Sequence, residues 1–413
     1  MLSTMNPVWT YKANDTIRDV CISGNSEYIG AASYDKNIYF FDRTGRLLWE
    51  YETGGVARDV AISSDGEYII ACSDDKNIYI FDRNGRIVLR YEAKNIVRNV
   101  SISSDGGCAV AGSDDKNIYF FDRKGKMWNY ETKGWVGRVA VSSNGEYAVA
   151  GSVDHNVYFF DRSGRLLWTY KTGSWLETVA ISSNGSYVAA GSDDKNIYFF
   201  DKNGHLLWKY ETINPPVCIK VSSDANYIAV STEGKIYFFD RTGRSLWQNI
   251  TGFEAPETKI SGNGEIVVAG SRNNQLTVFD RVGRKIWKYD AGSWVETVDI
   301  TMNGRYCVSG TQDGEIIMFD NSAFFEENVN ELRRKTDYLR NMGKNVDESE
   351  NLLNLSLNAA KNREYTNAMN YLAGCKNLIE KFGAVPIEKC SSCLKKIESE
   401  WSICPYCGKR LKI

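Results

Sequence analysis

The sequence predicts an all-β fold, an eight-bladed β-propeller, followed by a small α-helical segment and a C-terminal zinc ribbon. Three observations predict this architecture. A hydrophobic strand ending in Phe-Asp recurs every 39 or 40 residues, each period holds four strand-like segments, and the last 28 residues carry two Cys-x-x-Cys pairs. A fixed period of this length is typical of repeat folds, in which each unit packs on its neighbours.

The repeat occupies residues 1–320. In the second period, residues 58–63 alternate apolar and polar side chains, whereas 68–72 form a continuous apolar run. Two further strands follow at 78–81 and 86–91, and turn residues such as Ser-Asp-Gly separate all four. Four short antiparallel strands in about 40 residues are typical of a propeller blade. The aspartates that mark the eight periods are Asp42, Asp82, Asp122, Asp161, Asp201, Asp240, Asp280 and Asp320.

The fourth strand of the repeat is out of phase with the other three. It appears first at Val8-Trp9-Thr10-Tyr11, before any other strand, and it is missing after Asp320. We therefore predict that the N-terminal strand completes the last blade. This pairing would close a ring of eight blades, not seven, and would leave no open sheet edge.

The stretch Asp-Arg-x-Gly-Arg-Leu-Leu-Trp resembles the quinoprotein-like (PQQ-like) branch of the propeller superfamily and, more loosely, the WD-repeat proteins. The resemblance covers residues 1–320. It implies that tryptophans at one repeat position lock neighbouring blades together: Trp49, Trp168, Trp208, Trp247 and Trp287. Enzymes of this family hold pyrroloquinoline quinone with dedicated polar, calcium-binding and sometimes disulfide-forming residues. The chain has no adjacent Cys-Cys pair, so a quinone- or small-ligand-binding propeller is the third interpretation.

Composition favours a non-enzymatic cytoplasmic protein. The net charge of -2 does not indicate nucleic acid or membrane as a partner, and no apolar run approaches the roughly 18 residues that a membrane span needs. We expect no secretory signal and no membrane insertion. Six of the ten cysteines are scattered through apolar patterns and are predicted to be reduced core residues. With only two histidines, most histidine-based catalysis is excluded.

Charged residues and tryptophans are expected at the mouth of the central channel. The position five residues before the Ser or Thr that ends each first strand reads Arg18, Arg58, Arg98, Gly137, Glu177, Val217, Pro256 and Glu296. One arc is therefore basic and the opposite arc acidic. Three blades carry tryptophan two places earlier: Trp135, Trp175 and Trp294. We interpret this mouth as a partner-binding site, since aromatic anchors beside charges are typical of interfaces.

A structural alternative exists for the same residues. The arginines and glutamates could pair with each other or with the turn aspartates, and the tryptophans could cap the core. The turn aspartates are Asp35, Asp75, Asp115, Asp154 and Asp194. Their Asp-Lys-Asn turns could suggest cation binding, but Asp and Asn are also the residues that tight turns prefer.

The opposite propeller face is rich in arginine, which suggests nucleic-acid or ribonucleoprotein association as the alternative function. Acidic loops such as Asp65-Gly66-Glu67 reach the same face, so a solvated mixed surface is favoured. The arginines are Arg43, Arg46, Arg83, Arg86, Arg162, Arg165, Arg241, Arg244, Arg281 and Arg284.

A helical period replaces the strand period at residues 321–385, where apolar residues recur at helical spacing up to Gly343 and again up to Gly383. Residues 386–413 then carry Cys390, Cys393, Cys404 and Cys407. Two paired-cysteine knuckles predict one tetrahedral zinc ion, and the segment resembles the small zinc-ribbon family. Four thiolates leave no open coordination position, so the zinc would be structural. The whole chain is predicted to be a scaffold that uses the propeller mouth and the ribbon as two contact sites.

Overall fold

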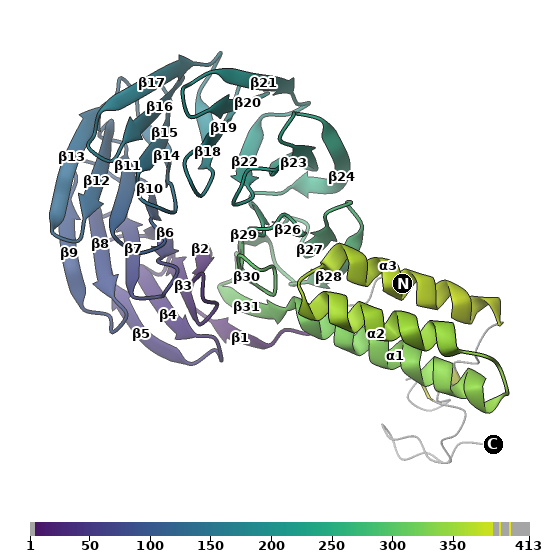
Figure 1. Ribbon diagram of the computed structural model, residues 1–413. Helices are drawn as coiled ribbons and strands as arrows, with labels where there is room; N and C mark the ends of the chain where they lie inside the picture. The colour runs from purple at the N-terminus through teal and green to yellow at the C-terminus, as the bar shows by residue number, and fades with distance from the viewer. Residues whose placement is uncertain (1–4, 383–387, 390–395, 398–413) are drawn as a thin grey trace. The chain divides into compact units, whose positions relative to one another are not determined.

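Eight β-sheets form a closed ring in the computed structural model, which describes residues 5–382, 388–389 and 396–397 (Figure 1). Blades 1–5 are β2–β5, β6–β9, β10–β13, β14–β17 and β18–β21. Blade 6 is β22–β24, blade 7 is β25–β28, and blade 8 combines β29–β31 with β1. Each first strand contacts the first strand of the next blade, and β29 contacts β2. The prediction of an eight-bladed propeller is therefore confirmed.

The four strands of a blade run outward from the central channel. The first strands are β2 (Ile17–Ile22), β6 (Ala57–Ile62), β10 (Val97–Ile102), β14 (Val136–Val141), β18 (Leu176–Ile181), β22 (Pro216–Val221), β25 (Thr258–Ile260) and β29 (Val295–Ile300). The second strands are β3 (Tyr28–Ser33), β7 (Tyr68–Ser73), β11 (Cys108–Ser113), β15 (Tyr147–Ser152), β19 (Tyr187–Ser192), β26 (Ile266–Gly270) and β30 (Tyr306–Thr311).

The third strands are β4 (Asn37–Asp42), β8 (Asn77–Asp82), β12 (Asn117–Asp122), β16 (Asn156–Asp161), β20 (Asn196–Asp201), β27 (Gln275–Asp280) and β31 (Glu315–Asp320). In blade 6 the second and third strands are continuous in β23 (Tyr227–Asp240). The outer strands are β5 (Leu47–Glu52), β9 (Ile87–Glu92), β13 (Gly125–Glu131), β17 (Leu166–Lys171), β21 (Leu206–Glu211), β24 (Ser245–Glu254), β28 (Lys285–Asp290) and β1 (Trp9–Lys12).

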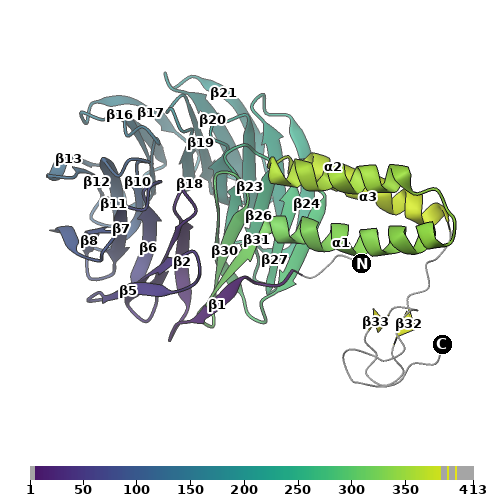
Figure 2. The same cartoon turned by 60° about the horizontal axis from the view of Figure 1, so that its bottom comes forward.

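The N-terminal strand closes the ring, as the phase of the repeat predicts. β1 pairs antiparallel with β31, and Trp9 lies opposite Met318 (Figure 2). An ion pair of 2.9 Å between Lys12 and Asp313 adds to this pairing. The two ends of the repeat region therefore share one sheet, and the eighth blade has its full set of four strands.

Tryptophans join neighbouring blades, which confirms the docking role that the resemblance implies. The indole N–H of Trp168 donates to the carbonyl oxygen of Lys202 in the next blade at 3.0 Å. The ring lies against Gly204, whose φ of +85° suits glycine, and a Cβ there would come within 2.7 Å of the indole. Indole-to-carbonyl bonds of the same kind are made by Trp9, Trp49, Trp128, Trp208 and Trp247. Between blades 2 and 3, Leu89 occupies this position.

The core lies in the second and third strands, whose side chains are almost all buried. All six cysteines outside the C-terminal cluster are free and buried, as predicted for small core residues: Cys21, Cys72, Cys108, Cys218, Cys307 and Cys375. The outer strands alternate between half-buried and exposed residues, because one of their faces meets water.

Three helices follow the propeller: α1 (Asn321–Asn341), α2 (Asp347–Lys361) and α3 (Tyr365–Lys381). Apolar residues on their predicted stripes are buried, among them Val329, Leu353 and Leu372. Residues 1–324 and 363–366 form one compact unit. Residues 325–362 and α3 from Asn367 onward belong to a second unit. None of the described helices combines the length and the apolar character that a membrane crossing requires. The described part of the tail contains two short paired strands, β32 (Glu388–Lys389) and β33 (Lys396–Ile397).

Candidate functional site

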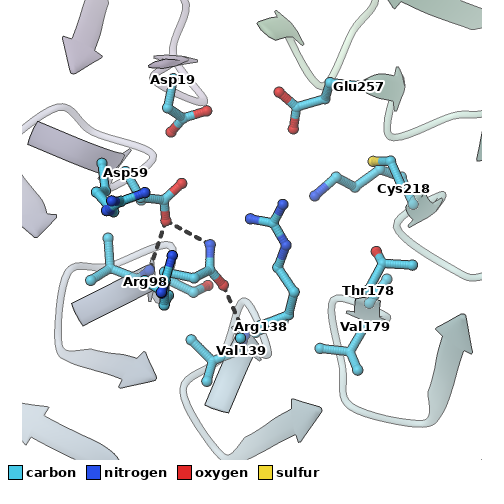
Figure 3. A pocket seen from close by; sticks show the side chains of 18 of the residues that line it. Asp19, Asp59, Arg98, Arg138, Val139, Thr178, Val179, Cys218 and Glu257 are labelled. Carbon is cyan, nitrogen blue, oxygen red and sulfur yellow. Dashed lines mark hydrogen bonds between the residues drawn. The ribbon is translucent and has the colours of Figure 1, made fainter. Parts of the chain in front are cut away.

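A cavity of about 670 Å³ opens into the central channel, and the first strands of the blades supply its wall (Figure 3). Seven of these strands contain a β-bulge near their start, as between Ile17 and Asp19 in β2. A bulge changes the direction of the side chains that follow it. Two consecutive residues, such as Arg18 and Asp19, therefore both line the channel.

We call the first of these two residues the rim position and the second the inner-ring position. The rim residues are the eight residues predicted from the sequence at the mouth. The inner-ring residues are Asp19, Asp59, Asn99, Arg138, Thr178, Cys218, Glu257 and Thr297. All eight rim residues line the cavity, as do Trp135 and Trp175, whereas Trp294 is not part of its wall.

The rim is less polarised than the sequence predicts, because two of its three arginines are neutralised. Arg58 forms a two-pronged ion pair with Asp74, and Arg98 forms one with Asp114 at 2.6 Å. These partners directly precede Asp75 and Asp115, two of the turn aspartates that we considered as possible ion-pair partners of the rim arginines. In blade 8, Glu296 lies 3.6 Å from Arg272.

Arg18 is the rim arginine that differs from the other two. Tyr34 stands 16 residues after it, at the place where Arg58 and Arg98 have an aspartate. Within the described residues Arg18 forms no ion pair, and its charge is therefore available at the mouth. On the opposite arc, burial and then Asp193 raise the pKa of Glu177, which weakens the acidic character of that arc.

The three predicted rim tryptophans are exposed. The exposed fraction is 52% for Trp135, 51% for Trp175 and 41% for Trp294. Their side chains therefore do not cap the core. The guanidinium of Arg272 lies 5.4 Å from the centre of the Trp294 ring, which is a cation–π distance. Trp135 and Trp175 belong to loops of adjacent blades and together provide an apolar surface beside the cavity.

The inner ring joins the blades around the channel. Side chains at this position accept a backbone N–H from the first strand of the next blade. Asp19 accepts from Val60 at 3.0 Å. Asn99 accepts from Val139 at 2.8 Å, and this bond is drawn in Figure 3. Asp59, Thr178 and Thr297 accept in the same way from Val100, Ile219 and Val20. These polar residues thus have a structural role, because a buried N–H without a partner is costly.

Charges concentrate on the arc formed by blades 1, 2, 7 and 8. Burial, and then the carboxylates of Asp59 and Glu257, raise the pKa of Asp19 well above its usual range. Burial also raises the pKa of Asp59. Lys259 lies 3.2 Å from Glu257 and 3.6 Å from Asp299, and it holds the pKa of Glu257 below its usual range despite burial.

The sequence analysis did not single out five charged residues that the first strands place in the channel wall. These are Asp19, Asp59, Lys220, Lys259 and Asp299. A sequence signal did exist, because each is a charged residue inside a first strand and is followed directly by an apolar residue. Their clustering depends on ring closure, which brings blade 8 next to blade 1.

The arginines of the opposite face are mostly paired. Eight of the ten form an ion pair, for example Arg43 with Glu27 and Arg281 with Glu265. The mixed, solvated surface considered from the sequence therefore describes this face. The turn aspartates are also occupied: Asp75 accepts the Tyr79 hydroxyl and the backbone N–H groups of Asn77 and Gly54.

No group of three or more His, Cys, Asp or Glu side chains within the described ranges is placed to hold a metal ion. The predicted zinc ligands Cys390, Cys393, Cys404 and Cys407 lie outside the described residues. The two tail strands β32 and β33 flank the first cysteine pair in the sequence.

The fold and its repeat define a propeller of the WD-like and PQQ-like class. The family model described as "Outer membrane protein assembly factor BamB", a PQQ-like repeat, matches residues 114–249 and 232–323. These matches cover just over half of the chain, which therefore belongs to this PQQ-like propeller family. The model described as "WD domain, G-beta repeat" matches residues 5–42, 45–82 and 85–122.

Solved structures with the same fold have low sequence identity to the chain. Sqt1 of Chaetomium thermophilum bound to the N-terminus of ribosomal protein L10 has a TM-score of 0.67 at 14% identity, with coverage of 76% of this chain and 100% of that one. Sqt1 solved alone gives 0.67 at 13%, with coverage of 78% and 100%. The computationally designed protein Ika8 gives 0.66 at 17%, with coverage of 75% and 97%. These likenesses show the fold alone, and no curated protein matches the chain.

Proposed function

We propose that this protein is a non-enzymatic interaction scaffold that binds a protein segment at the mouth of its propeller. The observation that carries the proposal is the pair of exposed tryptophans, Trp135 and Trp175, at the edge of the channel cavity. Large exposed aromatic rings beside a concave surface are typical anchors of protein interfaces. The unpaired charge of Arg18 lies on the same rim and would favour an acidic residue in the bound segment.

The comparisons support this class of function without identifying a partner. WD repeats commonly act as interaction scaffolds, and the Sqt1 propeller was solved with the N-terminus of a ribosomal protein bound. The mostly paired arginines of the opposite face count against the nucleic-acid alternative, because paired arginines have less charge to offer to phosphates. The buried, free cysteines agree with a reducing compartment, and a cytoplasmic location stays a prediction.

Affinity capture from a lysate of source cells, with and without nuclease, tests the proposal. We expect the full chain to capture a protein partner that survives nuclease, and the double variant Trp135→Ala/Trp175→Ala to lose it. Truncation of anchor tryptophans commonly costs about 2 kcal/mol or more of binding free energy, which is roughly 30-fold in affinity. Leu207→Ala, an exposed apolar residue on outer strand β21, is the matched control and should bind normally.

Two results would contradict the proposal. Unchanged capture by the double variant would exclude the tryptophan surface as the contact site. Loss of the captured material after nuclease treatment would favour the nucleic-acid alternative.

We also propose that Cys390, Cys393, Cys404 and Cys407 hold one structural zinc ion, which would give the scaffold its second contact site. Elemental analysis of the purified chain should find one zinc per molecule, and Cys404→Ser should abolish stoichiometric binding. The buried Cys375 offers a matched control, since Cys375→Ser removes a thiol outside the cluster. Full zinc content in Cys404→Ser would show that the assignment is wrong.

A further inference from the structure

The channel wall has two arcs that differ in how completely their polar groups are satisfied. On the arc of blades 1, 2, 7 and 8, each carboxylate has partners within the wall. Asp59 accepts from the Asn99 amide and the Val100 N–H at 2.6 and 2.7 Å. Asp299 accepts from the Ile22 N–H at 2.8 Å and faces Lys259. This arc needs no ligand to satisfy its charges.

The arc of blades 4, 5 and 6 carries donors without acceptors. The only acceptor for the Arg138 guanidinium within the described residues is the Glu177 carbonyl, reached by Nε at 3.4 Å. Its two terminal nitrogens make no hydrogen bond or ion pair there. Lys220, on β22, also has no ion pair or hydrogen-bond partner among the described residues. Both side chains line the cavity, and together with Lys259 their charges lower the pKa of Glu257, although neither of the two forms an ion pair with it.

Thr178 lies on β18, between the strands that carry Arg138 and Lys220. Its hydroxyl oxygen accepts the Ile219 N–H at 3.0 Å, so its own proton is free to be donated. Figure 3 shows the guanidinium of Arg138 reaching into the open channel, with Thr178 on the neighbouring strand. Three donors from consecutive blades thus line this arc of the cavity.

The chemistry complementary to these donors is an oxyanion. A guanidinium presents parallel N–H groups that match a carboxylate or a phosphate, and an ammonium adds a point charge. The cavity volume of about 670 Å³ also lies within the usual range of small-molecule sites, about 300–1,000 Å³. We propose that the channel binds a small molecule whose carboxylate or phosphate group is held by Arg138, Thr178 and Lys220.

This site is distinct from the tryptophan surface of the proposed function. The tryptophans belong to the mouth loops, whereas Arg138 and Lys220 lie on the first strands within the channel. Occupancy of the channel therefore does not depend on partner binding, and each proposal can fail without the other.

Isothermal titration calorimetry of the full chain tests the site, with sodium phosphate and sodium succinate as probes. Sodium chloride holds the ionic strength constant, because exposed charges respond to salt. We expect saturable binding of at least one probe by the wild-type chain, and the preferred probe identifies the group as phosphate or carboxylate. Arg138→Gln and Lys220→Gln should each weaken binding at least tenfold.

Arg165→Gln is the matched control, since it removes the same charge from a side chain that is 75% exposed. Arg165 directly precedes outer strand β17 and is not part of the channel wall. It should bind as the wild type does. Thermal unfolding provides a second readout: the bound probe should raise the Tm of the wild-type chain and leave the Tm of Arg138→Gln unchanged. Absence of saturable binding with both probes, or wild-type affinity in both Arg138→Gln and Lys220→Gln, would overturn the proposal.

Discussion

Blades 1–5 repeat one turn contact almost unchanged, whereas blades 6–8 have lost it. In each of the first five blades a tyrosine hydroxyl donates to the aspartate four residues before it, as Tyr198 does to Asp194 at 2.6 Å. In blade 6, Glu233 replaces the aspartate, and the buried Tyr237 hydroxyl has no partner in the described residues. Blades 7 and 8 replace the tyrosine itself, with Thr277 and Ile317.

The difference shows that a repeat contact requires both of its partners. Blades 7 and 8 lost the tyrosine, so no buried hydroxyl is left over. Blade 6 has the tyrosine without the aspartate, so a buried hydroxyl donor is unsatisfied among the described residues. An unsatisfied buried donor costs about 1–3 kcal/mol of stability. Tryptophan junctions between blades occur in both groups of blades, as Trp168 and Trp247 show, although Leu89 replaces the tryptophan in blade 2.

The largest expected effect distinguishes a tryptophan junction in blades 1–5 from one in blades 6–8. Trp287, in blade 7, is fully buried and donates to the Asn321 side chain at 2.9 Å, whereas Trp168, in blade 4, is only half-buried. Trp287→Ala should lower the free energy of unfolding by about 3–5 kcal/mol, because it leaves a cavity and an unpaired buried amide. Urea unfolding should show a smaller loss for Trp168→Ala. Equal losses would mean that burial does not decide the strength of a junction.

A smaller effect is expected from removing one tyrosine hydroxyl group in blade 5 and one in blade 6. Tyr198→Phe deletes a hydroxyl that donates to Asp194 and should cost about 1–2 kcal/mol, measured by urea unfolding. Tyr237→Phe deletes a hydroxyl without a partner and should leave stability unchanged or raise it. The two substitutions remove the same atom, so each is the control for the other. A loss in Tyr237→Phe as large as that in Tyr198→Phe would contradict the comparison.

The inner ring offers a third test, in which one blade supplies the control for another. Asn99 already combines an acceptor for Val139 with an amide donor to Asp59. Asp19→Asn should reproduce this arrangement, with its oxygen accepting from Val60. The folded state raises the pKa of Asp19, so the folded chain binds more protons than the unfolded chain as pH rises above the unfolded value. The contribution of Asp19 to stability is therefore greatest at low pH and falls as pH rises toward the folded pKa.

Thermal unfolding from pH 5 to pH 8 should consequently show the variant Asp19→Asn gaining stability relative to the wild type as pH increases. Asp42→Asn is a useful contrast, because hydrogen bonds from Thr44 and Arg46 lower the pKa of Asp42 despite burial, and its stabilising effect is lost only as pH falls. A constant difference between wild type and Asp19→Asn across this range would argue against a raised pKa of Asp19 in the folded chain.

The sequence predicted more of the fold than of the site. Strand order, blade number and the closing role of β1 all follow from the spacing of one repeated segment. The rim positions also follow from that spacing, as does the exposure expected of loop tryptophans such as Trp135. The pairing of Arg58 with Asp74 could not be read from the spacing, because it depends on how two loops of one blade approach each other. The β-bulge that turns both Arg18 and Asp19 into the channel has no distinct sequence pattern.

By itself, the sequence determined the local elements and their number, because alternating polarity, turn residues and a fixed period act over short distances along the chain. Tertiary structure decided the electrostatics of the channel. Asp19 and Thr297 are far apart in the sequence, yet their side chains lie 3.2 Å apart because blade 8 closes on blade 1. The same closure left Arg138 and Lys220 without an ion pair among the described residues, since the partners of each charge in the wall depend on what neighbouring blades place beside it.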